Sequence, residues 1–315
     1  MRSWCLSIAT AALLANGARA EQVVLEPSSK WVLDYGETRC RLARTYGEGE
    51  NRSVLYLEQY APGSSFSWTV AGPLIERMRR SRNVSVQFAP GFAPLEIDQA
   101  DGLTLDGFGE AIAGRSYKPS KEYSPELTRA LAEKDMKKAR LLATQEEVEL
   151  PDDEGVAGML QLDSSDGAQI EALVLSQKGS DGTVLQLGNM RPVFEAMNTC
   201  VVNLATHWGL DPAVERAVVE RPDWTNAKAL VRRIVDRYPR AALNRGEQAN
   251  FQLRVMVGAD GKLTGCDLTE LTSAANFSDE VCPLMLSQAE FSPARNAEGE
   301  AVPSYYISRV LYRIR

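Results

Sequence analysis

The chain has 315 residues, of which 44% are apolar and 24% are charged, and its formal net charge is −7. This composition is that of an ordinary globular protein, and the length is enough for two domains of about 100–200 residues each. The negative charge argues against sequence-independent binding of nucleic acid or anionic lipid, because binding to either polyanion needs a surplus of Lys and Arg. We therefore expect no nucleic-acid partner.

The first twenty residues have the layout of a secretory signal peptide. Arg2 precedes an apolar stretch over residues 4–14, and small residues follow, which predicts cleavage between Ala20 and Glu21. This stretch is too short for a bilayer core of about 30 Å, and the alternative is a buried N-terminal helix. No other segment reaches the run of about 18 apolar residues that a membrane helix needs. We expect an exported, periplasmic protein.

The segment that follows the signal is rich in predicted strands. Apolar and polar residues alternate over short runs, and turn residues such as Pro62-Gly63 separate these runs. The predicted strands are residues 31–33, 40–42, 53–60 and 66–70, followed by a hairpin of residues 170–175 and 183–187.

Helical periodicity is present in two further stretches. A helix over residues 124–143 begins with Ser as N-cap and Pro at its first position, and a second runs from Pro192 to Trp208 with Gly209 as its C-terminal cap. The loop at residues 144–155 is acidic, but its spacing does not match an EF-hand. We expect a solvated loop there, with Ca²⁺ binding as the alternative.

The cysteines of an exported chain are expected to pair, because the compartment is oxidising. Four cysteines follow the signal: Cys40, Cys200, Cys266 and Cys282. Four cysteines allow three connectivities. Cys40 lies in the first strands of the presumed N-terminal domain and Cys200 in its last helix, so we expect these two to pair. Closing that loop would contribute at most ~5 kcal/mol by the chain-entropy estimate.

The last third of the chain predicts a connector and a second domain. Residues 211–237 are expected to form a helical connector, and Tyr238 to Arg315 a small domain. In that domain we expect a short helix, a strand at 251–257, an Asp260-Gly261 turn, a strand at 262–271 bulged at Gly265, a helix that begins near Cys282 and a last strand at 303–313. The predicted fold class is α+β, with a β-rich α+β domain over residues 21–210.

The residues of this second domain resemble the C-terminal domain of the TonB energy-transducer family. The resemblance rests on Tyr238-Pro239 with Ala242 and Gly246, the Asp260-Gly261 hairpin, Phe291-Ser292-Pro293-Ala294 and residues 299–303. It covers about a quarter of the chain. Gln248-Ala249-Asn250 departs from it, since the family usually has a glycine there, and so does Ala289-Glu290, where a Trp-Arg pair is common. Cys266 and Cys282 resemble a cysteine-paired variety, which implies a second disulfide.

The resemblance implies a periplasmic domain whose exposed sheet edge accepts a short peptide strand from an envelope protein. In this binding mode, unpaired backbone groups supply affinity and alternate side chains supply selectivity. The last strand is the candidate edge, with Tyr305, Ile307, Arg309 and Leu311 as candidate contacts. The alternative is that these residues only pack the domain.

A motor-coupled transducer would also need a retained membrane anchor and a long Pro-rich spacer. The one apolar segment has the pattern of a cleaved signal, and no stretch is Pro-rich. We therefore expect a partner-binding relative that meets the membrane only through its partners. An anchored transducer is the alternative if the N-terminus is not cleaved, and the sequence does not predict an oligomeric state.

The sequence gives little support for catalysis. His207 is the only histidine, which excludes a histidine-based metal cluster, and a packing or capping role is expected for it. The chain has no G-x-S-x-G, P-loop, H-E-x-x-H or complete G-x-G-x-x-G. We expect no enzyme activity, no cofactor and no metal. The alternative is a hydrolase or carbohydrate-active enzyme in the N-terminal domain.

Overall fold

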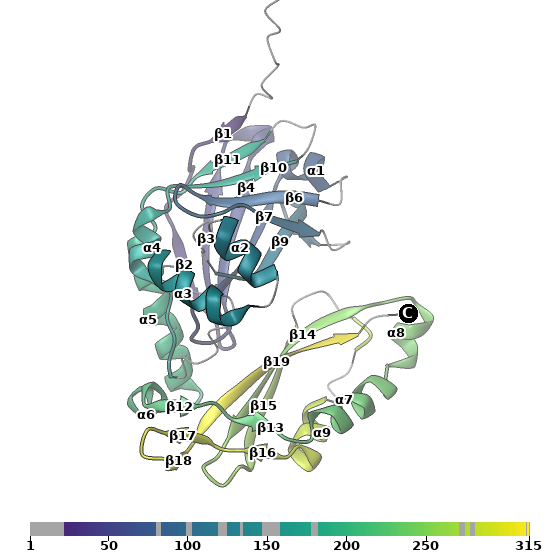
Figure 1. Ribbon diagram of the computed structural model, residues 1–315. Coiled ribbons are helices and arrows are strands. Elements are labelled where there is room, and N and C mark those ends of the chain that lie inside the picture. Colours follow the sequence, from purple (N-terminus) through teal and green to yellow (C-terminus); the bar gives the residue numbers. More distant parts are fainter. Residues whose placement is uncertain are drawn as a thin grey trace, which may run out of the picture.

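The computed structural model describes residues 22–79, 83–98, 103–118, 125–132, 135–146, 158–177, 182–270, 275–277, 281–312 and 314. The predicted cleavage site between Ala20 and Glu21 and most of the acidic loop lie outside these residues. The chain has the predicted α+β fold, with an N-terminal unit (purple to teal) above a C-terminal unit (green to yellow) in Figure 1. None of the described helices is long and apolar enough to cross a membrane.

Two sheets form the N-terminal unit. The first has the order β2-β3-β4-β5-β9-β8 and consists of β2 (Val32–Tyr35), β3 (Cys40–Tyr46), β4 (Ser53–Gln59), β5 (Phe66–Ala71), β9 (Gly109–Tyr117) and β8 (Thr104–Leu105). The second has the order β1-β11-β10-β6-β7 and consists of β1 (Val23–Leu25), β11 (Thr183–Gln186), β10 (Ala172–Ser176), β6 (Asn83–Ala89) and β7 (Leu95–Asp98). All pairs are antiparallel except β1 with β11.

Apolar side chains of both sheets meet in one core. Phe66 of β5 packs edge to face against Phe88 of β6, with ring centroids 5.3 Å apart, and against Phe194, at 5.6 Å. Phe194 belongs to α5 (Arg191–His207), so these three rings join the two sheets and the long helix. On β9, Gly114 lies opposite Trp68, and a Cβ at Gly114 would be 2.3 Å from the indole nitrogen. Only glycine fits there without displacing the buried Trp68 ring.

Shorter helices complete this unit: α1 (Pro73–Arg79), α2 (Pro125–Ala132), α3 (Met136–Glu146) and α4 (Ser164–Gln169), with a 3₁₀ turn at Gly49–Asn51. The prediction of one helix over residues 124–143 was wrong, because α2 and α3 are separate. Asp135 precedes α3, and its Oδ1 accepts a hydrogen bond from the backbone N–H of Lys138 at 3.1 Å. Such a cap satisfies an N–H at the start of a new helix, so it favours a helix boundary over a continuous helix.

The C-terminal unit contains a three-stranded antiparallel sheet. Its order is β15-β14-β19, with β14 (Ala249–Val257), β15 (Leu263–Glu270) and β19 (Ser304–Tyr312). The helices are α7 (Ala227–Asp236), α8 (Arg240–Asn244) and α9 (Val281–Gln288). Residues of β14 are alternately buried and half-buried, and its buried side chains share a core with those of α7 and α9. The predicted order of helix, hairpin, helix and strand is confirmed.

The hairpin between β14 and β15 has the expected turn and bulge. Gly261 has φ +78°, and a Cβ there would be 2.5 Å from the carbonyl oxygen of Phe291. The pairing register shifts between Met256 and Val257, which face Gly265 and Leu263. This irregularity lies at the glycine where the sequence predicts a bulge.

Two disulfides covalently link a helix to a sheet, one in each unit. Cys40 of β3 is bonded to Cys200 of α5, with a Cα–Cα distance of 6.0 Å. Cys266 of β15 is bonded to Cys282 of α9, with a Cα–Cα distance of 5.5 Å. These are the two expected pairs.

The expected helical connector is a mixed segment that belongs largely to the C-terminal unit. After α6 (Pro212–Arg216), β12 (Val218–Glu220) pairs with β17 (Ala294–Asn296), which also pairs with β18 (Ala301–Val302), and β13 (Asp223–Trp224) pairs with β16 (Phe291–Ser292). Trp224 stacks on Phe291 with ring centroids 6.0 Å apart, and Leu230 and Ile234 of α7 enter the C-terminal core. The C-terminal unit therefore begins before Tyr238, because residues 218–236 supply part of its core.

Candidate partner-binding site

The last long strand, β19, lies at an edge of its sheet. It pairs with β14 from Ser304 to Tyr312, and among the described strands none pairs with its other side. The backbone N–H and C=O groups along such an edge can pair with a strand from another chain. The edge position of the last strand is the feature on which the predicted binding site depends.

Side chains of β19 alternate between the two faces of the sheet. Tyr306, Val310 and Tyr312 pack with the C-terminal core. The four candidate contacts alternate with these residues and therefore lie on the other face: Tyr305, Ile307, Arg309 and Leu311. Ile307 and Arg309 line a cleft between the units, and Leu311 is 44% exposed.

Tyr305 differs from the other three candidates because the N-terminal unit covers it. Met159, Ala205 and Leu210 form an apolar cluster around this side chain, whose exposed fraction is 5%. Trp208 also packs against the Tyr305 ring edge to face, with centroids 5.8 Å apart. The Tyr305 side chain is therefore packed between the two units, which agrees with the alternative that this residue serves packing.

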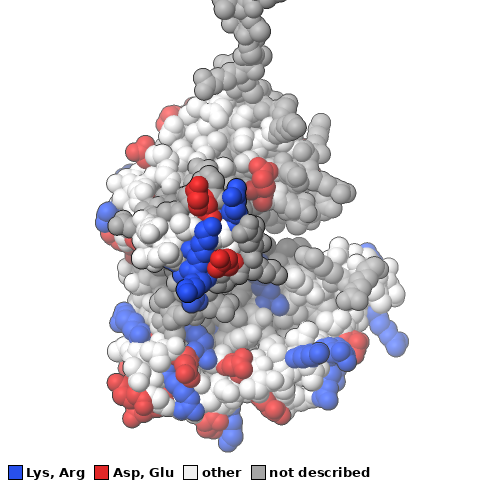
Figure 2. Space-filling model, viewed as in Figure 1, with Lys and Arg blue, Asp and Glu red and all other residues white. Residues whose placement is uncertain are grey.

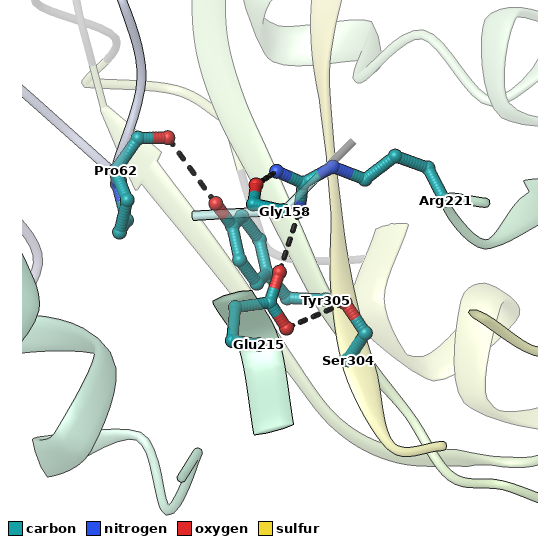
Figure 3. A network of polar contacts seen from close by, with 6 residues as sticks. All are labelled: Pro62, Gly158, Glu215, Arg221, Ser304 and Tyr305. Atoms are coloured by element: carbon teal, nitrogen blue, oxygen red, sulfur yellow. Dashed lines mark hydrogen bonds and ion pairs between the residues drawn. The ribbon is translucent and has the colours of Figure 1, made fainter. Parts of the chain in front are cut away.

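Polar contacts around Tyr305 extend this junction, as Figure 3 shows. Its hydroxyl donates a hydrogen bond to the carbonyl oxygen of Pro62 at 3.2 Å. Burial raises the pKa of Tyr305 to about 12, so the hydroxyl stays protonated and remains a donor at neutral pH. The guanidinium carbon of Arg221 lies 5.3 Å from the centre of the Tyr305 ring. Arg221 also donates to the carbonyl oxygen of Gly158.

Glu215 is the buried charge of this network. One carboxylate oxygen pairs with Arg221 at 2.6 Å, and the other accepts a hydrogen bond from Ser304 Oγ at 2.8 Å. Only 1% of the Glu215 side chain is exposed. Loss of solvent raises the pKa of Glu215, and the contacts with Ser304 and Arg221 oppose that rise. The network thus links α6 and β19 to the segment that follows β12. It also includes the loops that contain Pro62 and Gly158.

An open cleft of about 390 Å³ lies beside this network. One wall comes from β19 and β14, and the other from the end of β4, the loop at residues 60–65 and the start of β5. Its lining residues are Glu58, Gln59, Tyr60, Ala61, Pro62, Gly63, Ser65, Phe66, Ser67, Arg221, Pro222, Gln252, Tyr305, Tyr306, Ile307 and Arg309. Figure 2 shows the surface hollowed between the two units, with acidic and basic side chains interspersed on the face in view.

A smaller hollow of about 310 Å³ lies where the end of α5 meets the C-terminal sheet. Its lining includes His207, Trp208 and Arg254. The guanidinium carbon of Arg254 lies 3.9 Å from the centre of the Trp208 ring, which is a cation–π contact between the units. His207 is the last residue of α5, the position where the sequence predicts a capping or packing role.

Sequence reasoning missed the residues that join the two units. The sequence predicts only a turn at Pro62-Gly63, and it places Glu215 and Arg221 in the expected connector without assigning them a role. Ser304 and Gly158 carry no motif. A buried carboxylate needs a partner, but nothing in the sequence marks Glu215 as buried, so no local signal would have found this network.

Comparison with known proteins supports the family resemblance that the sequence of the C-terminal unit indicates. Residues 235–314 match the family described as Gram-negative bacterial TonB protein C-terminal. These residues form a TonB C-terminal-like segment. The match begins in the last turn of α7, contains the whole β15-β14-β19 sheet and covers about a quarter of the chain. No curated protein matches the chain.

Domains of the TonB C-terminal family are non-enzymatic, are associated with the cell envelope and interact with envelope proteins. The N-terminal unit, which forms one wall of the cleft, lies outside the match. Across the described residues, no group of three or more His, Cys, Asp or Glu side chains could hold a metal ion.

Proposed function

We propose that this chain is an exported, periplasmic protein that binds an envelope protein by strand addition at the open edge of β19, in transport or energy transduction. The observation that carries the proposal is the position of β19. It is an edge strand of nine residues in a TonB C-terminal-like segment, and a cleft borders it. An added strand would complete the hydrogen bonding of that edge.

The two disulfides support the exported location. Disulfides persist in oxidising compartments such as the periplasm and are rare in the cytosol. Sequencing the N-terminus of the native protein tests this part of the proposal. A mature chain that starts at Glu21 supports a released periplasmic protein, whereas an intact Met1 supports the alternative of an anchored transducer.

The structure gives the alternative of an enzyme no specific support. The two buried carboxylates nearest the cleft, Glu58 and Glu215, are each held in ion pairs with arginine. A general acid or base must reach a proton of the substrate, and here arginine side chains and the Ser304 hydroxyl contact these carboxylate oxygens. We therefore propose no reaction for the N-terminal unit.

Site-specific crosslinking tests strand addition at β19. A photoreactive amino acid at Leu311, which lies on β19 and is 44% exposed, should form an adduct with an envelope protein in cells. The same probe at Leu286 on α9, which is 52% exposed, is the matched control and should form none. Mass spectrometry of the adduct would identify the crosslinked segment.

That segment, made as a synthetic peptide, should bind the purified chain and lose binding when its backbone nitrogens are methylated. Methylation removes the N–H donors on which strand pairing depends. Equal adducts from Leu311 and Leu286, or a methylated peptide that binds as well as the parent, would contradict the proposal.

A further inference from the structure

The helices α7 and α8 carry a concentration of positive charge in an acidic chain. Residues 227–245 contain six basic side chains and one acidic side chain, whereas the net charge of the whole chain is −7. Figure 2 shows basic side chains gathered over the part of the C-terminal unit where Figure 1 places these helices. The basic residues are Lys228, Arg232, Arg233, Arg237, Arg240 and Arg245. The charge of the whole chain therefore hides a local positive surplus.

These six side chains are exposed, and no carboxylate among the described residues neutralises them. The ion pairs within that part of the chain include none of the six. Arg41 on β3, by contrast, pairs with Glu58 at 2.8 Å. Arg233 donates a hydrogen bond to the Gln288 side chain, which carries no charge. The positive potential of this face is therefore available to a ligand.

An exposed apolar stripe borders the basic side chains on α7. One side of this helix is buried in the C-terminal core. Val231 and Val235 lie four residues apart on the exposed flank, where their exposed fractions are 44% and 52%. Lys228 and Arg232 have the same spacing and come next around the helix, because successive residues are about 100° apart. Leu243 adds a third apolar side chain on α8, at 49% exposed.

An apolar stripe flanked by basic side chains suits the surface of an anionic membrane. The apolar side chains can enter the boundary between lipid headgroups and acyl chains, while Lys and Arg bind the lipid phosphates. A ligand that offers charge alone, such as a polyacidic polypeptide, would leave Val231 and Val235 in water. The combination of the two kinds of side chain therefore favours lipid.

We propose that α7 and α8 form a face that docks the protein on a membrane surface containing anionic phospholipid. This inference does not rest on strand addition, and it departs from the expectation that the protein meets the membrane only through its partners. Tyr238, between the two helices, packs against Tyr312 of β19 with ring centroids 5.3 Å apart. Docking would therefore hold the end of β19 close to the membrane surface.

Cosedimentation of the purified chain with lipid vesicles tests this inference. Vesicles of mixed phosphatidylglycerol and phosphatidylcholine are compared with vesicles of phosphatidylcholine alone. The test variant combines Lys228→Glu with Arg232→Glu on α7. The matched control combines Lys137→Glu with Arg140→Glu on α3, since these residues are also exposed and also consist of one lysine and one arginine.

We expect binding to the mixed vesicles alone, and we expect added salt to weaken it. The α7 variant should lose at least about tenfold in vesicle affinity, whereas the α3 control should lose less than about twofold. Arg240→Glu with Arg245→Glu on α8 is a second variant, and it should lose as much as the α7 variant. The charge-preserving pair Val231→Ser and Val235→Ser should lose about threefold, because it removes the apolar contact only.

Several outcomes would overturn the docking face. These are no binding to the mixed vesicles, equal losses in the α7 variant and the α3 control, and equal binding to both kinds of vesicle. Full vesicle affinity after the two valine changes, or labelled polyglutamate that binds as tightly as the vesicles, would identify an acidic polypeptide as the ligand in place of lipid. None of these outcomes bears on the crosslinks from Leu311, so strand addition at β19 is tested separately.

Discussion

Asp163 is a single residue whose charge supports a short helix. Its Oδ1 accepts hydrogen bonds from the backbone N–H of Ser165 at 2.7 Å and from its hydroxyl at 2.6 Å, which caps the start of α4. These bonds, above all that from the Ser165 side chain, hold the pKa of Asp163 below its ordinary value. The charged form is therefore the one that stabilises the folded state.

The stabilisation by Asp163 is present above the ordinary pKa of an aspartate and is lost as pH falls through the lowered folded-state value. Asp163→Ala should lower the free energy of unfolding by about 1 kcal/mol at neutral pH. Asp163→Asn keeps an acceptor without the charge, so its deficit should be smaller at neutral pH and should shrink further toward about pH 3. Urea unfolding at both pH values measures this, and a deficit of Asp163→Asn that grows on acidification would contradict it.

At the scale of elements, the two disulfides differ in the length of chain that they close. Cys40–Cys200 joins β3 to α5 across 160 residues, and Cys266–Cys282 joins β15 to α9 across 16. The chain-entropy estimate gives about 5 kcal/mol for the longer loop and about 3 kcal/mol for the shorter. Each disulfide thus limits the unfolded states of a different unit.

Replacing both cysteines of a pair by serine should therefore cost more for Cys40 and Cys200 than for Cys266 and Cys282, by about 2 kcal/mol. Guanidinium unfolding of the two double variants, with the unsubstituted chain as reference, measures the difference. A larger loss from the shorter loop would show that packing around each sulfur pair, rather than loop length, sets its contribution.

Elements with strong local patterns could be predicted from the sequence, and elements that depend on distant partners could not. The alternation in β14, the turn at Gly261 and the apolar stripe of α5 are local, and the predictions built on them were confirmed. β16 and β17 are two and three residues long and gain their strand partners from β13 and β12, far away in the chain. No local periodicity marks strands of that length.

The same limit applied to the candidate site. The alternation of the last strand predicts a strand, but it could not show that the N-terminal unit covers the Tyr305 side chain. Its hydrogen bond to Pro62 joins residues 243 positions apart. A contact of that separation depends on how the two units pack, which neither segment encodes alone.

At the scale of the whole molecule, the pair of Glu215 and Arg221 stabilises the junction between the units. Arg221→Met should lower the free energy of unfolding by about 3 kcal/mol at neutral pH, because it leaves a buried carboxylate without its cation. The double variant of Arg221→Met with Glu215→Gln should recover part of that loss, since the amide carries no charge. Urea unfolding of the two single variants and the double variant gives the coupling.

The pH dependence of these variants follows from the raised pKa of Glu215. The stability that a raised carboxyl pKa contributes is present below the ordinary value and is lost as pH rises through the folded-state value. The deficit of Arg221→Met should therefore be smaller near pH 4 than at pH 7, and Glu215→Gln should abolish that difference. A deficit that is the same at both pH values, or larger at the lower one, would contradict a buried, charged Glu215 as its cause.

The pairing of β12 and β13 with β17 and β16 has a practical consequence for dissecting this protein. A fragment cut at residue 235, where the family match begins, would lack both strands and nearly all of α7. Phe291 would lose the Trp224 ring that stacks on it, and the surface that Leu230 and Ile234 cover would be exposed to solvent. Such a fragment would be prone to self-association through that bare apolar surface. A fragment that starts ahead of Val218 keeps these contacts and is the appropriate unit for isolating the TonB C-terminal-like sheet.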